Sequence, residues 1–344
     1  MKTWQALGGW IGAHLAVLAP ICVAIGVLTP GIFGPVNTYA VPFLFACMTF
    51  QGSLSNTFRQ VLDVFRHPVL MLLVIASAQV VLPLIAYGLG LLFFAGSPQI
   101  VTGILLEYCV PVGVITYMWV GMYGGNTPLA LGTILVSTLI APFTIPLTLQ
   151  FLMGTVIHVD AMGMMLSMIG MVGVPSVLGM LVNQLSDGWG SRVLSPAIAP
   201  AVKLFVIVII ISNSTGMSDY VLHPTPQLLA VAAFVLVFSS VGYLWGLGLA
   251  HLLHRAHPDA VTLSFACGIR NISAGAVIAG QYFPGTPVIF PCMVGTLLQQ
   301  ILAGGNGALL KRLDRRSSTA RSEDATITAD AKNLRAKGNS EADN

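Results

Sequence analysis

The chain has 344 residues, of which 56% are apolar and only 8% are charged. A soluble domain carries roughly 25% charged residues, so this composition excludes a soluble globular protein and predicts one whose solvent is lipid. The formal net charge is only +3, and the chain lacks the basic face that a nucleic-acid-binding protein needs. We therefore expect an integral membrane protein without a nucleic-acid partner.

Ten apolar runs are long enough to cross the roughly 30 Å hydrocarbon core of a bilayer. In chain order they are residues 7–28, 36–54, 69–94, 101–123, 127–153, 161–183, 196–217, 227–253, 260–282 and 287–310. Only helices or closed barrels satisfy their backbone groups in lipid, and runs of this length fit helices. The sequence therefore predicts an all-α protein with ten transmembrane helices.

The basic residues predict the orientation of these helices, because cytoplasmic loops carry the excess of Lys and Arg. With the N-terminus inside, the cytoplasmic side receives Lys2, Arg59, Arg66, Arg192, Arg255 and the Lys311–Arg312 pair. The opposite loops receive no Lys or Arg. We therefore expect both termini in the cytoplasm, and the short chain suggests the inner (plasma) membrane of a bacterium.

The end of the chain has a different composition. Eight of the fifteen basic residues and six of the twelve acidic residues lie in the segment 311–344. This polar segment without aromatics cannot bury enough apolar surface to offset its ordering entropy, so we expect a disordered cytoplasmic tail.

The five cysteines all lie in apolar runs, without the CxxC spacing of a metal site. We read them as small core residues. No cofactor, no metal site and no obligate protein partner is expected from the sequence.

Two segments five spans apart resemble each other. Residues 109–117 read CVPVGVITY and are followed by GGNTP and VSTLI, and residues 267–275 read CGIRNISAG and are followed by PGTP and VGTLL. An odd number of spans per unit gives the two units opposite orientations, as in many secondary transporters. We therefore predict two inverted five-helix repeats, residues 1–153 and 161–310.

Both matching segments contain residues that interrupt helices. Pro111 removes a backbone donor, and Gly113, Gly268 and Gly275 lower helix propensity. Broken helices within a membrane are tolerated only where they are buried in protein or line a water-filled cavity. Two breaks at matching positions favour a solute site over two structural kinks.

Three ionisable residues lie inside the predicted spans, where a charge costs at least ~2.5–3.5 kcal/mol on insertion scales. Arg270 is about 16 Å along its helix from Asp259, near the midplane. Glu107 is about 9 Å deep from the outer side, and we hypothesise that it faces Arg270 when no substrate is bound. Lys203 lies near enough to the cytoplasmic side for its stem to snorkel, which favours a structural role.

At these residues the chain resembles the bile acid:sodium symporter family over residues 7–310. The resemblance rests on the segment 43–68, on Gln79 with Pro83, on 109–126 and on 268–274. It implies ten helices in a panel domain and a core domain, and two broken helices, the fourth and the ninth, that cross in the core. It also implies two sodium ions beside the crossing and an organic anion in the adjacent cavity.

This chain departs from the family at the sodium ligands that the resemblance implies. A Ser-Asn pair of the family corresponds to Thr116 and Tyr117, and the shared Glu corresponds to Ala266. The family Gln before the retained Asn271 is Arg270, whose guanidinium offers only donors to a cation. A later Ser and Thr fall near Ala130 and Ile134, so sodium remains possible although its ligands look lost.

We hypothesise that Arg270 replaces the sodium charge and binds a substrate carboxylate in bidentate fashion. The predicted binding set is Arg270, Asn271, Ser273, Thr116, Tyr117 and Gln79, with Glu107 as a coupling or charge-pair residue. Each polar member has an alternative reading as a contact between helices. The predicted function is a secondary transporter of small organic anions that works by alternating access.

Four alternatives stay open. The chain could be a sodium-coupled organic anion symporter, an exporter of the arsenite or auxin-carrier type with the same fold, a channel, or a membrane enzyme. An enzyme would need a metal set or an acid–base pair inside the spans, and His14 is the only histidine clearly within one.

Overall fold

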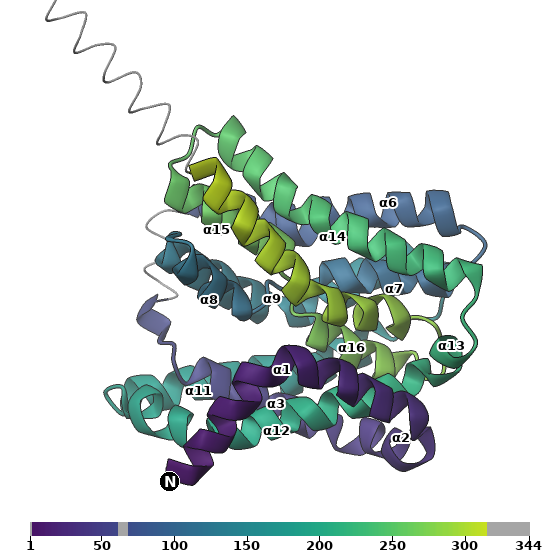
Figure 1. Ribbon diagram of the computed structural model, residues 1–344, viewed down its shortest axis with the longest axis horizontal. Coiled ribbons are helices and arrows are strands. Elements are labelled where there is room, and N and C mark those ends of the chain that lie inside the picture. Colours follow the sequence, from purple (N-terminus) through teal and green to yellow (C-terminus); the bar gives the residue numbers. More distant parts are fainter. Residues whose placement is uncertain (1, 61–67, 315–344) are drawn as a thin grey trace, which may run out of the picture. The chain divides into compact units, whose positions relative to one another are not determined.

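A computed structural model describes residues 2–60 and 68–314 (Figure 1). Within these residues the chain forms helices and one isolated β-bridge, without a strand. The prediction of an all-α protein is therefore confirmed. Arg66 of the predicted cytoplasmic loop and the predicted tail from residue 315 onward lie outside the described residues.

The helices of residues 2–303 form two layers (Figure 1). In the first layer, α1 and α3 pack on α12, and α3 also packs on α11. Its members are α1 (Lys2–Leu28), α2 (Pro30–Tyr39), α3 (Val41–Ser53), α11 (Val174–Leu185), α12 (Ser195–Ser214) and α13 (Ser218–Leu222). Elements from the start and the middle of the chain thus share one layer.

In the second layer, α6 packs on α7, α14 packs on α15, and α9 contacts α7, α8 and α15. The members are α5 (Pro68–Ala76), α6 (Leu82–Phe94), α7 (Pro98–Cys109), α8 (Ile115–Met122), α9 (Thr127–Met153), α14 (Pro226–Leu252), α15 (His257–Gly268) and α16 (Ile272–Tyr282). The helix α10 (Ala161–Met168) packs on α9 and continues through a π-helical turn into α11. Because α16 contacts α7 as well as α2, α3 and α12, it lies where the layers meet.

Polar caps and prolines explain where several helices begin. Asn126 accepts a hydrogen bond from the N–H of Leu129 at the start of α9, and Thr225 accepts one from Leu228 at the start of α14. A proline occupies the first turn of α7, α9 and α14, where its missing N–H costs nothing. The caps satisfy donors that would otherwise face lipid or the membrane interface without a partner.

Five helical segments of the described chain are long and apolar enough to cross a membrane. They are Val69–Phe94, Thr127–Met153, Ala161–Leu185, Gly190–Leu222 and Pro226–Leu252. Two bent pairs, Thr3–Gly12 with Val17–Leu28 and Pro30–Val36 with Val41–Ser53, raise the number to seven if each pair is one span. The chain therefore crosses a membrane several times, whereas the ten-span count stays a prediction.

The last described residues end in helical structure. Residues 289–303 are helical and complete the first compact unit, and residues 304–314 are helical within a second unit that runs from Gly304 to Asn344. Residues 311–314 therefore extend a helix into the segment that we expected to be tail. The division of the chain into repeats at 1–153 and 161–310 stays a prediction.

Candidate functional site

The first interrupted helix is α7, which stops at Cys109, and the chain does not resume a helix until Ile115. Val110, directly after α7, is extended with φ −66° and ψ 155°. Pro111 follows it and has no N–H to donate, so a helical hydrogen bond cannot continue through this position. The local sequence therefore explains this interruption.

The second interruption lies between Gly268 at the end of α15 and Ile272 at the start of α16. Ile269 is extended here, with φ −100° and ψ 125°. The ring of Tyr243 on α14 lies so close to Gly268 that a Cβ at this position would overlap it. Glycine therefore permits the close approach of α14 to the end of α15.

The two interrupted segments pair with each other through their backbones. Their contacts are an antiparallel bridge between Val112 and Arg270, a hydrogen bond from the Gly113 N–H to the Ile269 oxygen (3.2 Å) and one from the Asn271 N–H to the Pro111 oxygen (2.8 Å). Each interrupted segment thus supplies hydrogen-bond partners for backbone groups of the other segment that have no helical hydrogen bond. We call the residues 110–114 and 269–271 the crossing.

Substitution of Gly113 tests how tightly the crossing is packed. A Cβ on Gly113 would lie 2.7 Å from the carbonyl oxygen of Arg270, whereas a Cβ on Gly88 in α6 would meet nothing within 4 Å. We therefore expect Gly113→Ala to cost about 1–3 kcal/mol, because the two segments must move apart, and Gly88→Ala to be neutral or stabilising. Thermal unfolding of both variants in detergent measures the difference, and equal midpoints would contradict this packing.

Arg270 is buried in the crossing with 3% of its surface exposed. Its Nη2 donates to the Cys267 oxygen (3.3 Å), and its backbone N–H donates to the side-chain oxygen of Gln299 (3.1 Å). Its Nε and Nη1 have no hydrogen-bond partner. A guanidinium remains charged in proteins, so the crossing holds a permanent positive charge with two unused donors.

Glu107 on α7 lies on the same small cavity as Arg270, which has a volume of about 10 Å³. Its side chain is 1% exposed, and its Oε2 has no hydrogen-bond partner. The two residues are close enough to interact electrostatically, but no ion pair within 4 Å joins them. The structure thus places the hypothesised pair around one cavity without direct contact between the charged groups.

The other residues of the predicted binding set differ in how far their side chains are buried. Thr116 is fully buried and its hydroxyl has no partner, whereas Asn271 and Ser273 are half-buried. Gln79 donates from its amide to the Ser137 oxygen (3.2 Å) and keeps an unpartnered Oε1. Tyr117 is 47% exposed and does not join the buried cluster.

Ser137 connects Gln79 to the crossing. Its hydroxyl accepts a hydrogen bond from the Val112 N–H (3.3 Å) and donates one to the Ile134 oxygen (3.0 Å). The Val112 N–H, which the first interruption leaves without a helical partner, thus has an acceptor on α9. Gln79 and Ser137 therefore position the crossing, which is a role consistent with the reading of Gln79 as a contact between helices.

Several residues at the cavity were not found by sequence reasoning. They are Tyr108, Ser239, Tyr243, Gly295 and Gln299. They come from α7, α14 and the helical residues 289–303, which are far apart in the sequence. Gln299 offered a signal, because an amide within an apolar run needs a partner.

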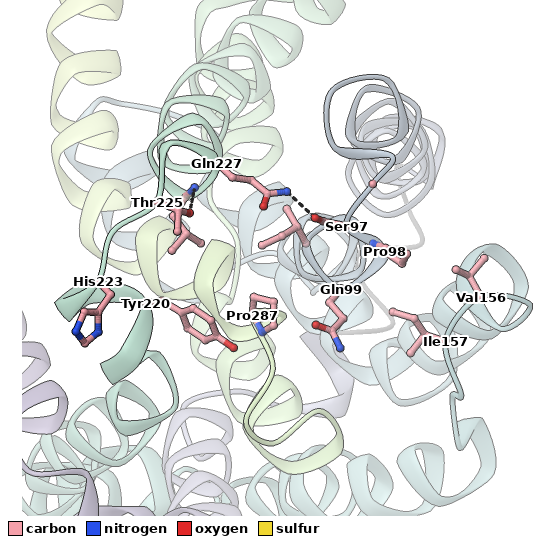
Figure 2. Close-up of a pocket in the computed structure, with 13 residues that line it drawn as sticks. Ser97, Pro98, Gln99, Val156, Ile157, Tyr220, His223, Thr225, Gln227 and Pro287 are labelled. Atoms are coloured by element: carbon pink, nitrogen blue, oxygen red, sulfur yellow. Dashed lines mark hydrogen bonds between the residues drawn. The ribbon is translucent and has the colours of Figure 1, made fainter.

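A much larger pocket, of about 490 Å³, opens at the start of α7 and α14 (Figure 2). Its wall includes Ser97, Gln99, Tyr220, His223 and Gln227, and the Gln227 amide donates to the Ser97 hydroxyl (2.6 Å). All of these residues lie on the side of the membrane that the sequence predicts to be the outer one. No Asp, Glu, Lys or Arg lines this pocket within the part of the chain that the structure describes, so it offers no fixed charge to an ion.

The residues at the crossing do not fit a bound cation. Ala266, at the end of α15, is fully buried and supplies no carboxylate, and Arg270 presents donors where a cation needs oxygen ligands. Among residues 2–60 and 68–314, no group of three or more His, Cys, Asp or Glu side chains could hold a metal ion.

Comparison with known proteins assigns a family to this architecture. The model of the sodium bile acid symporter family matches residues 41–224. Among similar proteins is the uncharacterized protein YbaS of Bacillus subtilis, 37% identical over 300 residues, which cover 87% of this chain and 97% of the relative.

Two more distant relatives carry functional names. The uncharacterized sodium-dependent transporter YocS of B. subtilis is 24% identical over 82% of this chain and 86% of its own length. The probable chloroplastic sodium/metabolite cotransporter BASS2 of rice is 24% identical over 86% of this chain and 70% of its own length. These names describe transporters and not enzymes. The chain therefore belongs to the sodium bile acid symporter family and is a membrane transporter.

Proposed function

We propose that this protein is a secondary transporter of small organic anions in which Arg270 supplies the positive charge at the crossing. The observation that carries the proposal is the buried guanidinium, whose Nε and Nη1 have no partner in the protein. Each of these nitrogens forms a two-donor edge of the planar group together with Nη2, and such an edge matches the two oxygens of a carboxylate.

The energetics of burial favour an anion as the missing partner. A charge in the interior is costly unless it is paired, and a hydrogen bond to a charged group contributes about 1.5–3 kcal/mol. An anion at Arg270 would give an unpartnered donor its acceptor and neutralise the charge. We propose that Asn271 and Ser273, which follow it in the chain and are half-buried, supply further hydrogen bonds, together with the unpartnered hydroxyl of Thr116.

The cavity at Arg270 has about 10 Å³, which is room for about one water molecule. An organic carboxylate is larger, so binding requires the crossing to open. We propose that this opening belongs to an alternating-access cycle of two inverted five-helix repeats. In this topology both termini are cytoplasmic, and the protein spans a bacterial inner membrane ten times.

In the same topology the 490 Å³ pocket at Ser97 and Gln227 faces outward. We propose that it is the outer entrance of the transport route, because its volume suits a small molecule. Its lining carries no fixed charge, so the preference for anions rests on Arg270.

Sodium-coupled transport is the second candidate function. The names of YocS and BASS2 favour it, but Ala266 and Arg270 replace an acidic and a neutral residue where the family resemblance implies a sodium site. A guanidinium at that place repels a cation. We therefore propose that transport does not depend on sodium.

Thermal unfolding of the purified protein tests both the binding of an organic anion and its independence from sodium. Lactate, succinate and benzoate are added singly, in sodium chloride and in choline chloride buffer. We expect at least one of them to raise the unfolding midpoint equally in both salts, because a ligand that binds only the folded state stabilises it. Uptake of that compound into proteoliposomes should also be equal in the two salts, and a requirement for sodium would contradict the proposal.

A further inference from the structure

The cavity shared by Glu107 and Arg270 contains more polar atoms than the protein satisfies. Four of them lack a hydrogen-bond partner, namely Glu107 Oε2, Arg270 Nε, Arg270 Nη1 and the Tyr243 hydroxyl. The residues that carry them all line the one cavity of about 10 Å³. A buried unsatisfied polar group costs about 1–3 kcal/mol, and more when it is charged, so this cluster is unexplained by packing.

Among the described residues that face Glu107, Arg270 is the one cation. Tyr108 on the same helix and Cys292 in the helical residues 289–303 interact with it electrostatically, and neither is a cation. The α14 side contributes Ser239 and Tyr243. The counter-charge of a Glu107 carboxylate must therefore be Arg270, directly or through a water molecule.

The helical residues 289–303 pack closely against the carboxyl group of Glu107. Gly295 lies so close that a Cβ would overlap Glu107 Oε1. Any other residue at this position would displace the carboxyl group from the cavity. The close packing keeps Glu107 beside Arg270 and away from solvent.

We propose that Glu107 is the proton-coupling residue of this transporter and that it exchanges its charge with the bound anion. This inference rests on the proposed function. In the empty site the Glu107 carboxylate balances Arg270. When a substrate carboxylate takes the guanidinium, Glu107 accepts one proton from the aqueous phase on the side from which the anion enters.

The charge balance gives the stoichiometry. Glu107 and Arg270 together carry no net charge before binding, and the protonated Glu107, Arg270 and a monoanion together carry none afterwards. A site that stays neutral avoids the cost of moving an unpaired charge through the membrane. One proton therefore accompanies each anion that Arg270 binds, and transport of a monoanion moves no net charge.

The first test needs no substrate. Infrared difference spectra of the purified protein in acidic and basic buffer report the protonation of buried carboxyl groups. We expect a carboxyl band in the wild type that is absent from Glu107→Gln. The same band should shift its pH midpoint by at least one unit in Arg270→Gln, because the counter-charge is removed.

The matched control is Asp187→Asn. Asp187 is exposed, and its φ of 49° is a conformation that Asn tolerates, so this variant should keep the wild-type band. A band that persists in Glu107→Gln, or a midpoint that does not move in Arg270→Gln, would overturn the proposal.

The second test measures protons taken up when the wild type binds lactate, succinate or benzoate in weakly buffered, sodium-free solution. We expect one proton per bound anion in the wild type, because Glu107 is the one group that takes up a proton. Glu107→Gln should bind the anion without proton uptake, and in proteoliposomes it should exchange labelled anion while losing accumulation driven by a pH gradient.

The outcomes separate the two proposals. Anion binding by the wild type without proton uptake would overturn the role of Glu107 and leave the proposed function intact. Failure of all three anions to bind would count against the proposed function, and the infrared titration would still decide whether Glu107 and Arg270 form a coupled pair.

Discussion

Arg270→Gln is expected to reduce anion uptake in proteoliposomes at least 100-fold, to the level of empty vesicles. The glutamine side chain keeps hydrogen-bonding capacity but removes the permanent charge that offsets the desolvation of an anion. Loss of one partner of a buried ion pair costs about 3–5 kcal/mol, which corresponds to a factor of about 100 to 4,000 in affinity.

Arg270→Lys separates charge from geometry. Lysine keeps the positive charge but replaces the planar fork by a point charge on a flexible stem. We expect at least tenfold weaker anion binding than in the wild type, together with residual uptake. Uptake equal to the wild type would show that the bidentate contact is not used.

Lys203→Met is the matched control for the removal of a cation. Lys203 on α12 donates to the Gly8 oxygen on α1 (2.7 Å), a contact within the first layer and on other helices than the crossing. This variant should lower the unfolding midpoint and keep uptake per folded molecule within about twofold, because single interhelical contacts contribute only ~0.6–2 kcal/mol. If Arg270→Gln folds and retains uptake within threefold of the wild type, Arg270 is not a substrate residue.

The second large effect is expected from reversing the charge of the crossing. In Ala266→Glu combined with Arg270→Gln, the end of α15 gains a carboxylate and loses the guanidinium. Ala266 is fully buried, so the new carboxylate has no water and needs a cation. We expect the double variant to become sodium-dependent, with uptake at least tenfold faster in sodium chloride than in choline chloride.

The two single variants are the controls for the double variant. Ala266→Glu alone keeps the guanidinium, which repels a cation, so it should remain insensitive to sodium. One of the two carboxyl groups, that of Glu107 or the new one, then stays protonated. Arg270→Gln alone is neutral at the crossing and should lose uptake in both salts. A double variant that folds but shows the same rate in both salts would mean that the net charge here does not select the coupling ion.

Local sequence predicted the helices and their interruptions because both depend on nearby residues. Apolar runs of about 20 residues were sufficient to predict helices in lipid, and Pro111 alone removes the donor that a continuous α7 would need. The breaks at 110–114 and 269–271 therefore lie within the predicted segments, whereas Gly275 does not interrupt a helix but lies inside α16. The unusual charge at Arg270 was also visible in one dimension.

Tertiary structure decided which groups meet. Arg270 and Glu107 are more than 160 positions apart, and the cavity between them is completed by Tyr243, Gly295 and Gln299 from two further elements. No local pattern encodes these contacts, because a side chain's surroundings within a helix layer depend on how helices pack against one another. Depth along a helix predicted that the two charges lie at similar levels, but not that both would keep atoms without a partner.

Composition, the length of the apolar runs and the positions of Pro111, Gly268 and Arg270 by themselves thus determined a multi-span helical membrane protein with two breaks and a buried cation, because hydrophobic length and backbone chemistry are local properties. Only the fold decided that the breaks pair with each other through Val112 and Arg270. It also decided that Tyr117 stays outside the buried cluster and that Glu107 shares the cavity of Arg270. These are consequences of packing between segments distant in the chain, where side-chain volume and unsatisfied hydrogen bonds select one arrangement.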